Sequence, residues 1–223
     1  MKTIRFFILS LVLVGVASPA LQAQITVGFK TGYTQAWEDY GDVNLPDDAI
    51  IHVNKFNVTT MGYYRLTPHF SLGIEPGFVK RGAACVPGWW GGTPGFSGDT
   101  QLTLNYVEMP LMLAFNTPFW SPKLEFKARL GYGVAYMVSA NEKIVDLETN
   151  KELFKQKVDF DRRNLNRWDN GVYLGIGFGY QIGKGSLLLE STYFGSPKNA
   201  DESNASKNRS WNINLGYAFL LSR

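Results

Sequence analysis

The sequence predicts an all-β protein: an eight-stranded antiparallel up-and-down transmembrane β-barrel with short periplasmic turns and long external loops. Three observations predict it. Apolar and polar side chains alternate with a period of two in eight segments, short and long connections alternate along the chain, and the last segment ends in apolar and aromatic residues. After residue 24 no apolar run reaches the roughly 20 residues that a membrane-spanning helix needs. A closed barrel is therefore the form in which this chain could cross a bilayer.

Residues 1–23 are expected to be a secretory signal peptide. Lys2 and Arg5 precede an apolar stretch, and Ala23 supplies the small residue that is needed just before the cleavage point. Cleavage after Ala20 is the alternative, because smaller residues then occupy both positions of the small-x-small pattern. The barrel domain is predicted to span residues 24–223.

Charge and cysteine content exclude two classes of protein. The whole chain has a formal net charge of +3, of which the leader contributes two basic residues, so the mature charge is +1. This is far from the basic excess that nucleic-acid binding favours, and no nucleic-acid partner is expected. Cys85 is the only cysteine, so an intramolecular disulfide cannot stabilise the fold.

The first three predicted strands each place apolar or aromatic side chains on one face and glycine, hydroxyl or charged side chains on the other. They cover residues 25–35, 56–66 and 70–81. Pro76 lacks the N–H that a sheet needs, which makes the third strand irregular at that point.

The fourth strand, residues 101–115, changes its pattern part of the way along. Val107 to Phe115 alternate with Glu108 and Pro110, whereas Leu102, Leu104 and Tyr106 have the opposite parity. We therefore expect a β-bulge near residues 105–107 that resets the faces, so that all of these apolar residues face lipid.

The remaining four strands alternate more regularly. Residues 123–138, 172–182 and 186–194 form the fifth to seventh strands, and in the sixth strand large apolar residues alternate mainly with glycines. The eighth strand carries Trp211, Ile213, Leu215, Tyr217, Phe219 and Leu221 on one face. Its other face is small or polar.

The lengths of the connections indicate which end of the barrel is external. The short ones are residues 67–69, 116–122 and 183–185, and the long ones are residues 36–55, 83–100, 139–167 and 195–208. Short turns are periplasmic in outer-membrane barrels, so both termini are expected in the periplasm. Residues 143–160 are expected to form a solvated hairpin that extends the fifth and sixth strands.

Nine charged side chains lie on the face opposite the apolar one: Lys30, Arg65, Glu75, Arg81, Glu108, Glu125, Lys127, Arg129 and Glu190. An eight-stranded barrel is just wide enough for side chains to fill it. We therefore expect these five bases and four acids to form a structural ionic network in the lumen. A soluble lipocalin-like barrel would invert the pattern, and so many aromatic residues would not fit inside it.

Three segments resemble the PorT-type outer-membrane β-barrel family of Bacteroidetes: residues 27–32, 104–113 and 175–180. The pattern Tyr106-x-Glu108-x-Pro110-Leu111 is the most specific of them. The resemblance covers residues 24–221 and implies an integral outer-membrane protein. The member for which the family is named acts in protein secretion, and the family supplies no catalytic motif.

The last strand also resembles the insertion signal that the barrel assembly machinery recognises. Asn214, Gly216, Phe219 and Leu221 occupy its polar, glycine and two apolar positions. The resemblance implies that this machinery is a partner during assembly.

Few residues suggest other chemistry. His52 and His69 are predicted on opposite sides of the membrane, so neither a shared catalytic site nor a metal site or cofactor is expected. Acidic residues of the first loop, including Glu38 and Asp39, are interpreted as solvated charges rather than calcium ligands. Trp89 and Trp90 in the second loop are candidates for contact with lipopolysaccharide, glycan or an envelope protein, and the alternative is that this loop simply folds over the barrel mouth.

These observations favour a non-enzymatic outer-membrane protein with a structural or interaction role, associated with the envelope or a secretion assembly through its external loops. A narrow solute channel is the first alternative. A lipid-acting enzyme and a lipocalin-like exported ligand binder are the others.

Overall fold

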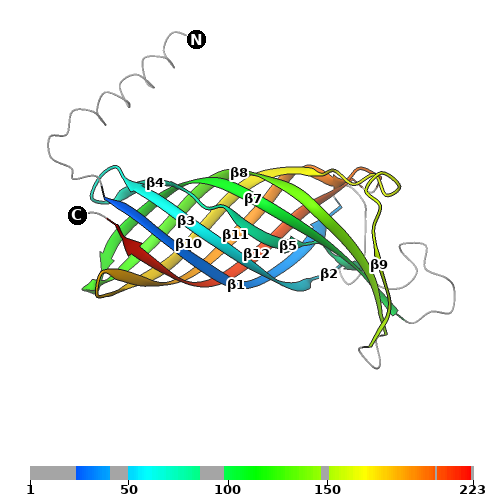
Figure 1. Ribbon diagram of the computed structural model, residues 1–223, viewed down its shortest axis with the longest axis horizontal. Helices are drawn as coiled ribbons and strands as arrows, with labels where there is room; N and C mark the ends of the chain where they lie inside the picture. Colours follow the sequence, from blue (N-terminus) through cyan, green and yellow to red (C-terminus); the bar gives the residue numbers. More distant parts are fainter. Residues whose placement is uncertain (1–23, 41–49, 86–97, 147–150, 204, 222–223) are drawn as a thin grey trace, which may run out of the picture.

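The computed structural model describes residues 24–40, 50–85, 98–146, 151–203 and 205–221. They form one ring of eight antiparallel strands without a helix (Figure 1). The ring consists of β1 (Ile25–Asp39), β3 (Val53–Arg65), β4 (Phe70–Ile74) with β5 (Gly77–Arg81), β7 (Gly98–Phe119), β8 (Ser121–Asp146), β10 (Trp168–Ile182), β11 (Gly185–Asp201) and β12 (Ser206–Leu220). Three short strands, β2 (Ile50–Ile51), β6 (Ala84–Cys85) and β9 (Glu152–Lys157), extend it at one end. The predicted signal peptide lies outside the described residues.

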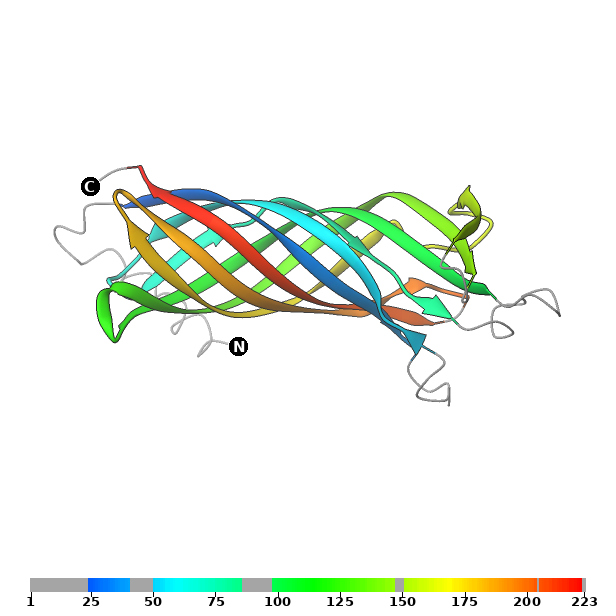
Figure 2. The same ribbon diagram turned by 90° about the horizontal axis from the view of Figure 1, so that it is seen from below.

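The barrel closes where the first strand meets the last. β1 pairs with β12 from Thr26 opposite Leu220 to Asp39 opposite Lys207, and both lie side by side in Figure 2. A path that starts at Val27 and passes from each residue to its partner on the next strand returns to β1 at Trp37, ten residues further along that strand. This stagger tilts the strands from the barrel axis by about 35–45° and leaves a narrow lumen.

The two faces of the wall have opposite chemistry. Phe29 and Leu215 are 52% and 55% exposed, whereas their neighbours Lys30 and Asn214 are each 3% exposed. Every long strand repeats this alternation, so an apolar band surrounds a polar interior. The transmembrane barrel prediction is confirmed, and the lipocalin-like alternative is wrong because the apolar side chains point outward. No helix among the described residues is long and apolar enough to span a membrane.

The strands extend further into the connections than the sequence predicted, as two of the connections illustrate. β7 and β8 meet in a tight turn at Trp120, whose φ is 58°, so most of residues 116–122 is strand. At the other end, β11 and β12 take up most of the predicted loop 195–208. Hydrogen bonds between neighbouring strands continue beyond the apolar band. There the alternation of apolar and polar residues no longer indicates a strand.

The third predicted strand is broken at Pro76, as the missing N–H predicts. Thr60 donates its N–H to the Pro76 carbonyl at 2.9 Å, and Glu75 donates to the Pro110 carbonyl at 3.1 Å. β4 and β5 therefore keep one register against β3 and β7 across the break.

The predicted bulge occurs at the expected level but in the neighbouring strand. Asn105 pairs with Ser139 and Tyr106 with Met137, so Val138 of β8 is the extra residue. β7 keeps its parity, and Leu102, Leu104 and Tyr106 are fully buried inside the barrel. The prediction that these three residues face lipid is wrong.

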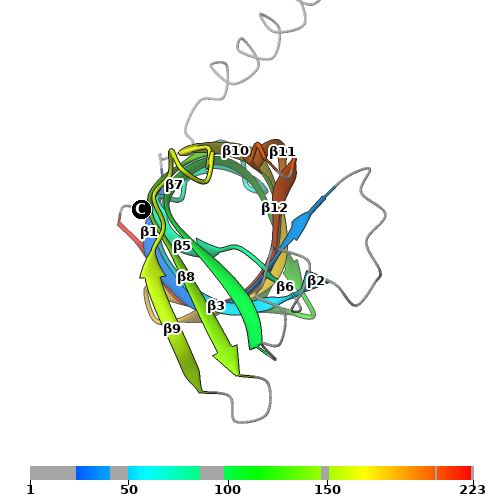
Figure 3. The same cartoon turned by 90° about the vertical axis from the view of Figure 1, so that its right-hand side faces the viewer.

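The external end is extended by strand pairing. β8 continues as a hairpin with β9, as the sequence predicted, and β6 connects β2 to β7. Viewed along the barrel axis, the β8–β9 hairpin projects beyond the circumference of the ring (Figure 3).

Candidate functional site

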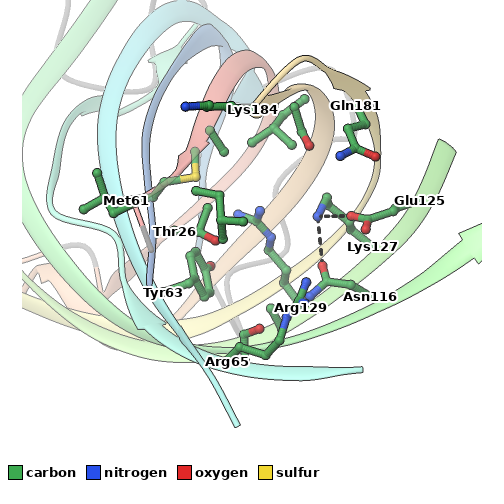
Figure 4. A pocket seen from close by; sticks show the side chains of 18 of the residues that line it. Thr26, Met61, Tyr63, Arg65, Asn116, Glu125, Lys127, Arg129, Gln181 and Lys184 are labelled. Atoms are coloured by element: carbon green, nitrogen blue, oxygen red, sulfur yellow. Dashed lines mark hydrogen bonds and ion pairs between the residues drawn. The ribbon is translucent and has the colours of Figure 1, made fainter. Parts of the chain in front are cut away.

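A cavity of about 510 Å³ occupies the periplasmic half of the lumen (Figure 4). Its charged lining comes from Arg65, Glu125, Lys127, Arg129 and Lys184, and its apolar lining includes Met61 and Leu188. Glycines in β10 leave room for long basic side chains, because a Cβ at Gly179 would lie 2.6 Å from Cε of Lys127.

The Lys127 ammonium group is held by two neighbours in this cavity. Its Nζ donates to Glu125 and to the Asn116 side-chain oxygen, both at 3.0 Å. Arg65, at the periplasmic mouth, instead donates to the Gln24 side chain at 2.5 Å. The cavity is therefore a polar recess that opens toward the periplasm.

Four buried charges close the inner end of the cavity. Lys30 Nζ lies 2.7 Å from Glu75 Oε2 and 3.1 Å from Glu190 Oε2, and Arg129 forms ion pairs with the same two carboxylates. Tyr63 donates its hydroxyl hydrogen to Glu75. We call Lys30, Glu75, Arg129 and Glu190 the central network. Two bases and two acids balance in charge, which offsets the cost of burying them.

A second ionic layer lies on the external side of the central network. Arg81 forms an ion pair with Glu108, and Tyr173 donates to the same carboxylate at 2.8 Å. The Arg81 guanidinium lies 3.7 Å from the centre of the Phe194 ring. A space of about 20 Å³ remains between the two layers, which is enough for about one water molecule.

Polar side chains continue toward the external mouth. Asn208 donates to the Tyr106 hydroxyl at 3.0 Å and to Asp169 at 2.9 Å, and Ser196 donates to Asp169 at 2.6 Å. Glu38 is completely buried beside Tyr40, which donates to it at 3.1 Å. The interpretation of Glu38 as a solvated loop charge is therefore wrong.

An apolar cap closes the external mouth. Its buried members are Val79, Leu102, Leu104, Tyr106, Ala135, Met137, Ala140, Val158, Leu165 and Ala200, with Phe160 packed against them. Val158 lies in the segment that was expected to form a solvated hairpin, and Leu165 lies further along the predicted connection 139–167. Part of that loop instead packs against the apolar cap, while β9 remains exposed.

The structure separates the nine predicted lumen charges into four groups. Lys30, Glu75, Arg129 and Glu190 form the central network, Arg81 and Glu108 the second layer, Glu125 and Lys127 a pair at the cavity wall, and Arg65 stands apart at the mouth. The cause of the separation is the stagger of the strands, which sets the height of each side chain in the barrel.

The other predicted site residues lie elsewhere. In the last strand Asn214 and Gly216 face the lumen, whereas Phe219 and Leu221 are exposed. Trp89 and Trp90 lie outside the described residues.

The two histidines are far apart, as predicted. His69 lies in a periplasmic turn, where its ring contacts the Asn116 carbonyl at 3.1 Å. His52 stacks edge-on against Trp37 at the external end.

Sequence reasoning missed several lumen residues, including Glu38, Asp169 and Asn208. Glu38 and Asn208 fall in predicted loops, and Asp169 lies between the predicted loop 139–167 and the sixth strand, so parity was not applied to any of them. Tyr63 and Tyr173 have the parity of the predicted lumen face, but their spacing gives no indication that each binds a buried carboxylate.

Comparison with solved structures finds barrels of low sequence identity. Ail, the attachment invasion locus protein of Yersinia pestis in complex with the heparin analogue sucrose octasulfate, is 12% identical, with 88% of this chain and 99% of that chain covered and a TM-score of 0.40. Neisserial surface protein A is 13% identical, with 87% and 96% covered and a TM-score of 0.45. The outer membrane protein OprG from Pseudomonas aeruginosa is 7% identical, with 87% and 95% covered and a TM-score of 0.48. No curated protein sequence matches the chain.

The family model of the outer membrane protein beta-barrel domain matches residues 17–196, which is most of the chain. Together with the closed barrel and its apolar outer band, this match places the protein in the outer membrane. The chain belongs to the outer membrane protein beta-barrel domain family and is an integral outer-membrane protein.

Proposed function

We propose that the protein is a non-enzymatic, non-conducting outer-membrane barrel with a structural or interaction role through its external end, in an envelope or secretion assembly. The observation that carries this proposal is the closed lumen. The central network, the Arg81–Glu108 layer and the apolar cap follow one another along the axis. A solute would have to pass all three.

The external end supplies a surface suited to a partner. All six residues of β9 are exposed, and Leu153 and Phe154 are each 49% exposed. Among the described strands β9 pairs only with β8, so its other edge presents backbone groups that can bind an added strand.

A shortened hairpin tests the interaction role. Asn141 pairs with Lys157, so residues 142–156 can be replaced by an Asn-Gly turn while Val158 and Leu165 stay in place. Cross-linking in cells followed by purification is expected to recover envelope proteins with the wild type and lose them with this variant. The control replaces Gly183-Lys184 in the periplasmic turn by Asn-Gly and should behave as the wild type. Equal recovery with all three proteins, each folded by gel mobility, would contradict the proposal.

The finer assignment to the PorT-type family is part of the proposal. Its support is the sequence pattern in β7, where Tyr106 and Glu108 enter the lumen and Leu111 faces lipid. A secretion role predicts that deleting the gene reduces the export of secreted proteins to the cell surface. Unchanged export would limit the protein to a structural role.

Two assembly features remain proposals as well. We expect residues 1–23 to be removed, so that N-terminal sequencing of the purified protein begins at Gln24. We also expect Asn214, Gly216, Phe219 and Leu221 to be recognised by the barrel assembly machinery.

Trp89 and Trp90 remain candidates for partner contact, which alanine substitution of both would weaken.

A narrow channel is the second candidate, because the 510 Å³ cavity already opens half of the lumen to the periplasm. Such a channel would require the inner layers to part, which ion conductance would detect. Lipid-acting catalysis predicts a changed lipid A mass after expression, and an unchanged mass supports the non-enzymatic role.

A further inference from the structure

Five lysines lie near the external ends of strands on one side of the barrel. Lys55 comes from β3, Lys80 from β5, Lys143 from β8, and Lys155 and Lys157 from β9. Lys143 lies directly opposite Lys155, and Lys157 lies opposite Asn141, so the last three lysines share one face of the hairpin. We call these five residues the lysine shelf.

The shelf has no carboxylate partners among the described residues. None of the ion pairs between described side chains involves its lysines. The Lys80 ammonium lies 4.2 Å from the centre of the Phe56 ring. Burial lowers the pKa of Lys55 to about 8, and the charges of Lys143 and Lys80 contribute to the shift. Like charges opposed across a strand pair are destabilising, so a bound anion would stabilise this arrangement.

The opposite face of the hairpin is already occupied. Glu142 accepts hydrogen bonds from Gln156 at 3.0 Å and from Arg163 at 2.6 Å, next to the segment that caps the barrel. The lysine face is therefore the continuation of the outer wall of β8. The hairpin projects sideways beyond the circumference of the ring (Figures 1 and 3), so this outer face would meet the membrane surface next to the barrel.

The shelf lies just external to the aromatic rim of the apolar band. Phe56 is 48% exposed and its ring lies 6.4 Å from that of Phe78. Aromatic side chains mark the membrane–water interface, so groups immediately external to them meet lipid headgroups. Basic residues near a membrane surface are attracted to anionic headgroups.

We propose that the lysine shelf binds the phosphate groups of a phosphorylated glycolipid of the outer leaflet, of the lipid A type. The glycolipid's acyl chains would lie along the apolar wall below Phe56, and its phosphates would lie between Lys80, Lys143 and Lys155. The proposal rests on the membrane location and does not depend on the interaction role proposed above.

Native mass spectrometry of the detergent-purified full chain tests the site with bisphosphorylated lipid A as the probe. The variant Lys80→Gln/Lys143→Gln/Lys155→Gln is expected to bind it at least tenfold more weakly, since each basic residue contributes about fivefold. The corresponding arginine variant should keep the affinity. The control is Lys198→Gln/Lys207→Gln, at the external end of β11 and β12, where Lys207 lies opposite Asp39. This control should bind as the wild type.

Two further probes distinguish the source of the phosphate. Lipid A without phosphates is expected to bind the wild type as weakly as the glutamine variant binds the phosphorylated lipid. Inorganic phosphate at millimolar concentration should not displace the lipid. Equal lipid A binding by the wild type and the glutamine variant, with both folded by gel mobility, would overturn the proposal. Displacement by inorganic phosphate would also overturn it and point to a free-phosphate site.

Discussion

Lys30 and Arg129 each contact both Glu75 and Glu190, and this arrangement decides how single substitutions act at the residue scale. All four side chains are almost fully buried. Removing one member leaves a net charge among side chains that are almost fully buried. The cost of a substitution is therefore set by the charge that remains rather than by the contact that is lost.

Arg129→Met leaves two buried carboxylates with Lys30 alone. The free energy of unfolding is expected to fall by about 3–5 kcal/mol, as when one partner of a buried pair is removed. Urea unfolding in lipid vesicles, followed by gel mobility, measures the change. Arg129→Met/Glu190→Gln restores the charge balance and should recover part of the loss. A single variant as stable as the wild type would show that the central network does not stabilise the barrel.

Glu38 gives a prediction with a defined pH dependence. It lies external to the apolar band, level with the Asp39–Arg209 ion pair, and burial raises its pKa. An acid with a raised folded pKa stabilises the fold at low pH and loses that contribution as the pH rises through the folded value. Glu38→Gln should therefore stabilise the barrel at neutral pH.

The gain from Glu38→Gln should shrink as the pH falls and the wild-type carboxyl becomes protonated. Urea midpoints at a series of pH values measure it. A difference that is constant with pH would mean that Glu38 stays charged in its buried site.

At the scale of elements, the seam between β1 and β12 depends on close backbone approach. A Cβ at Gly216 would lie 2.5 Å from the Phe29 carbonyl oxygen and 2.7 Å from the Lys30 Cβ. Neither is the free end of a flexible side chain, so the two strands would have to shift. Gly216 therefore has a packing role as well as its proposed role in the insertion signal.

Gly216→Ala is expected to lower stability by about 1–3 kcal/mol through overpacking and to reduce the folded fraction. The matched control is Gly62→Ala, where an added Cβ meets nothing within 4 Å. Heat-modifiable gel mobility after refolding compares the two. Equal folded fractions would show that the seam accommodates the extra methyl group.

Strand parity was predictable because lipid and lumen impose different chemistry on alternate residues, as Phe29 and Lys30 illustrate. The same rule failed for Leu102, Leu104 and Tyr106, which lie where the barrel extends beyond the band. Beyond the apolar band, an apolar side chain can equally well point into the barrel and pack in the apolar cap. The identity of the ion pairs was also not predictable. Lys30 and Glu190 are 160 residues apart, and their meeting depends on the stagger of the whole ring.

At the scale of the whole molecule, the closures act in series. The periplasmic cavity ends at the central network, the Arg81–Glu108 layer follows, and the apolar cap closes the external mouth. Neutralising the central network alone therefore leaves two closures in place. The barrel differs in this respect from a channel that a single gate controls.

Conductance in planar lipid bilayers tests the closed lumen most directly. Refolded wild-type protein, with insertion verified by protease protection, is expected to give no discrete current steps above the lipid baseline. Lys30→Met/Glu75→Gln/Arg129→Met/Glu190→Gln should also stay silent, because the outer layers remain. Reproducible unitary steps from the wild type would contradict the account and establish the protein as a channel.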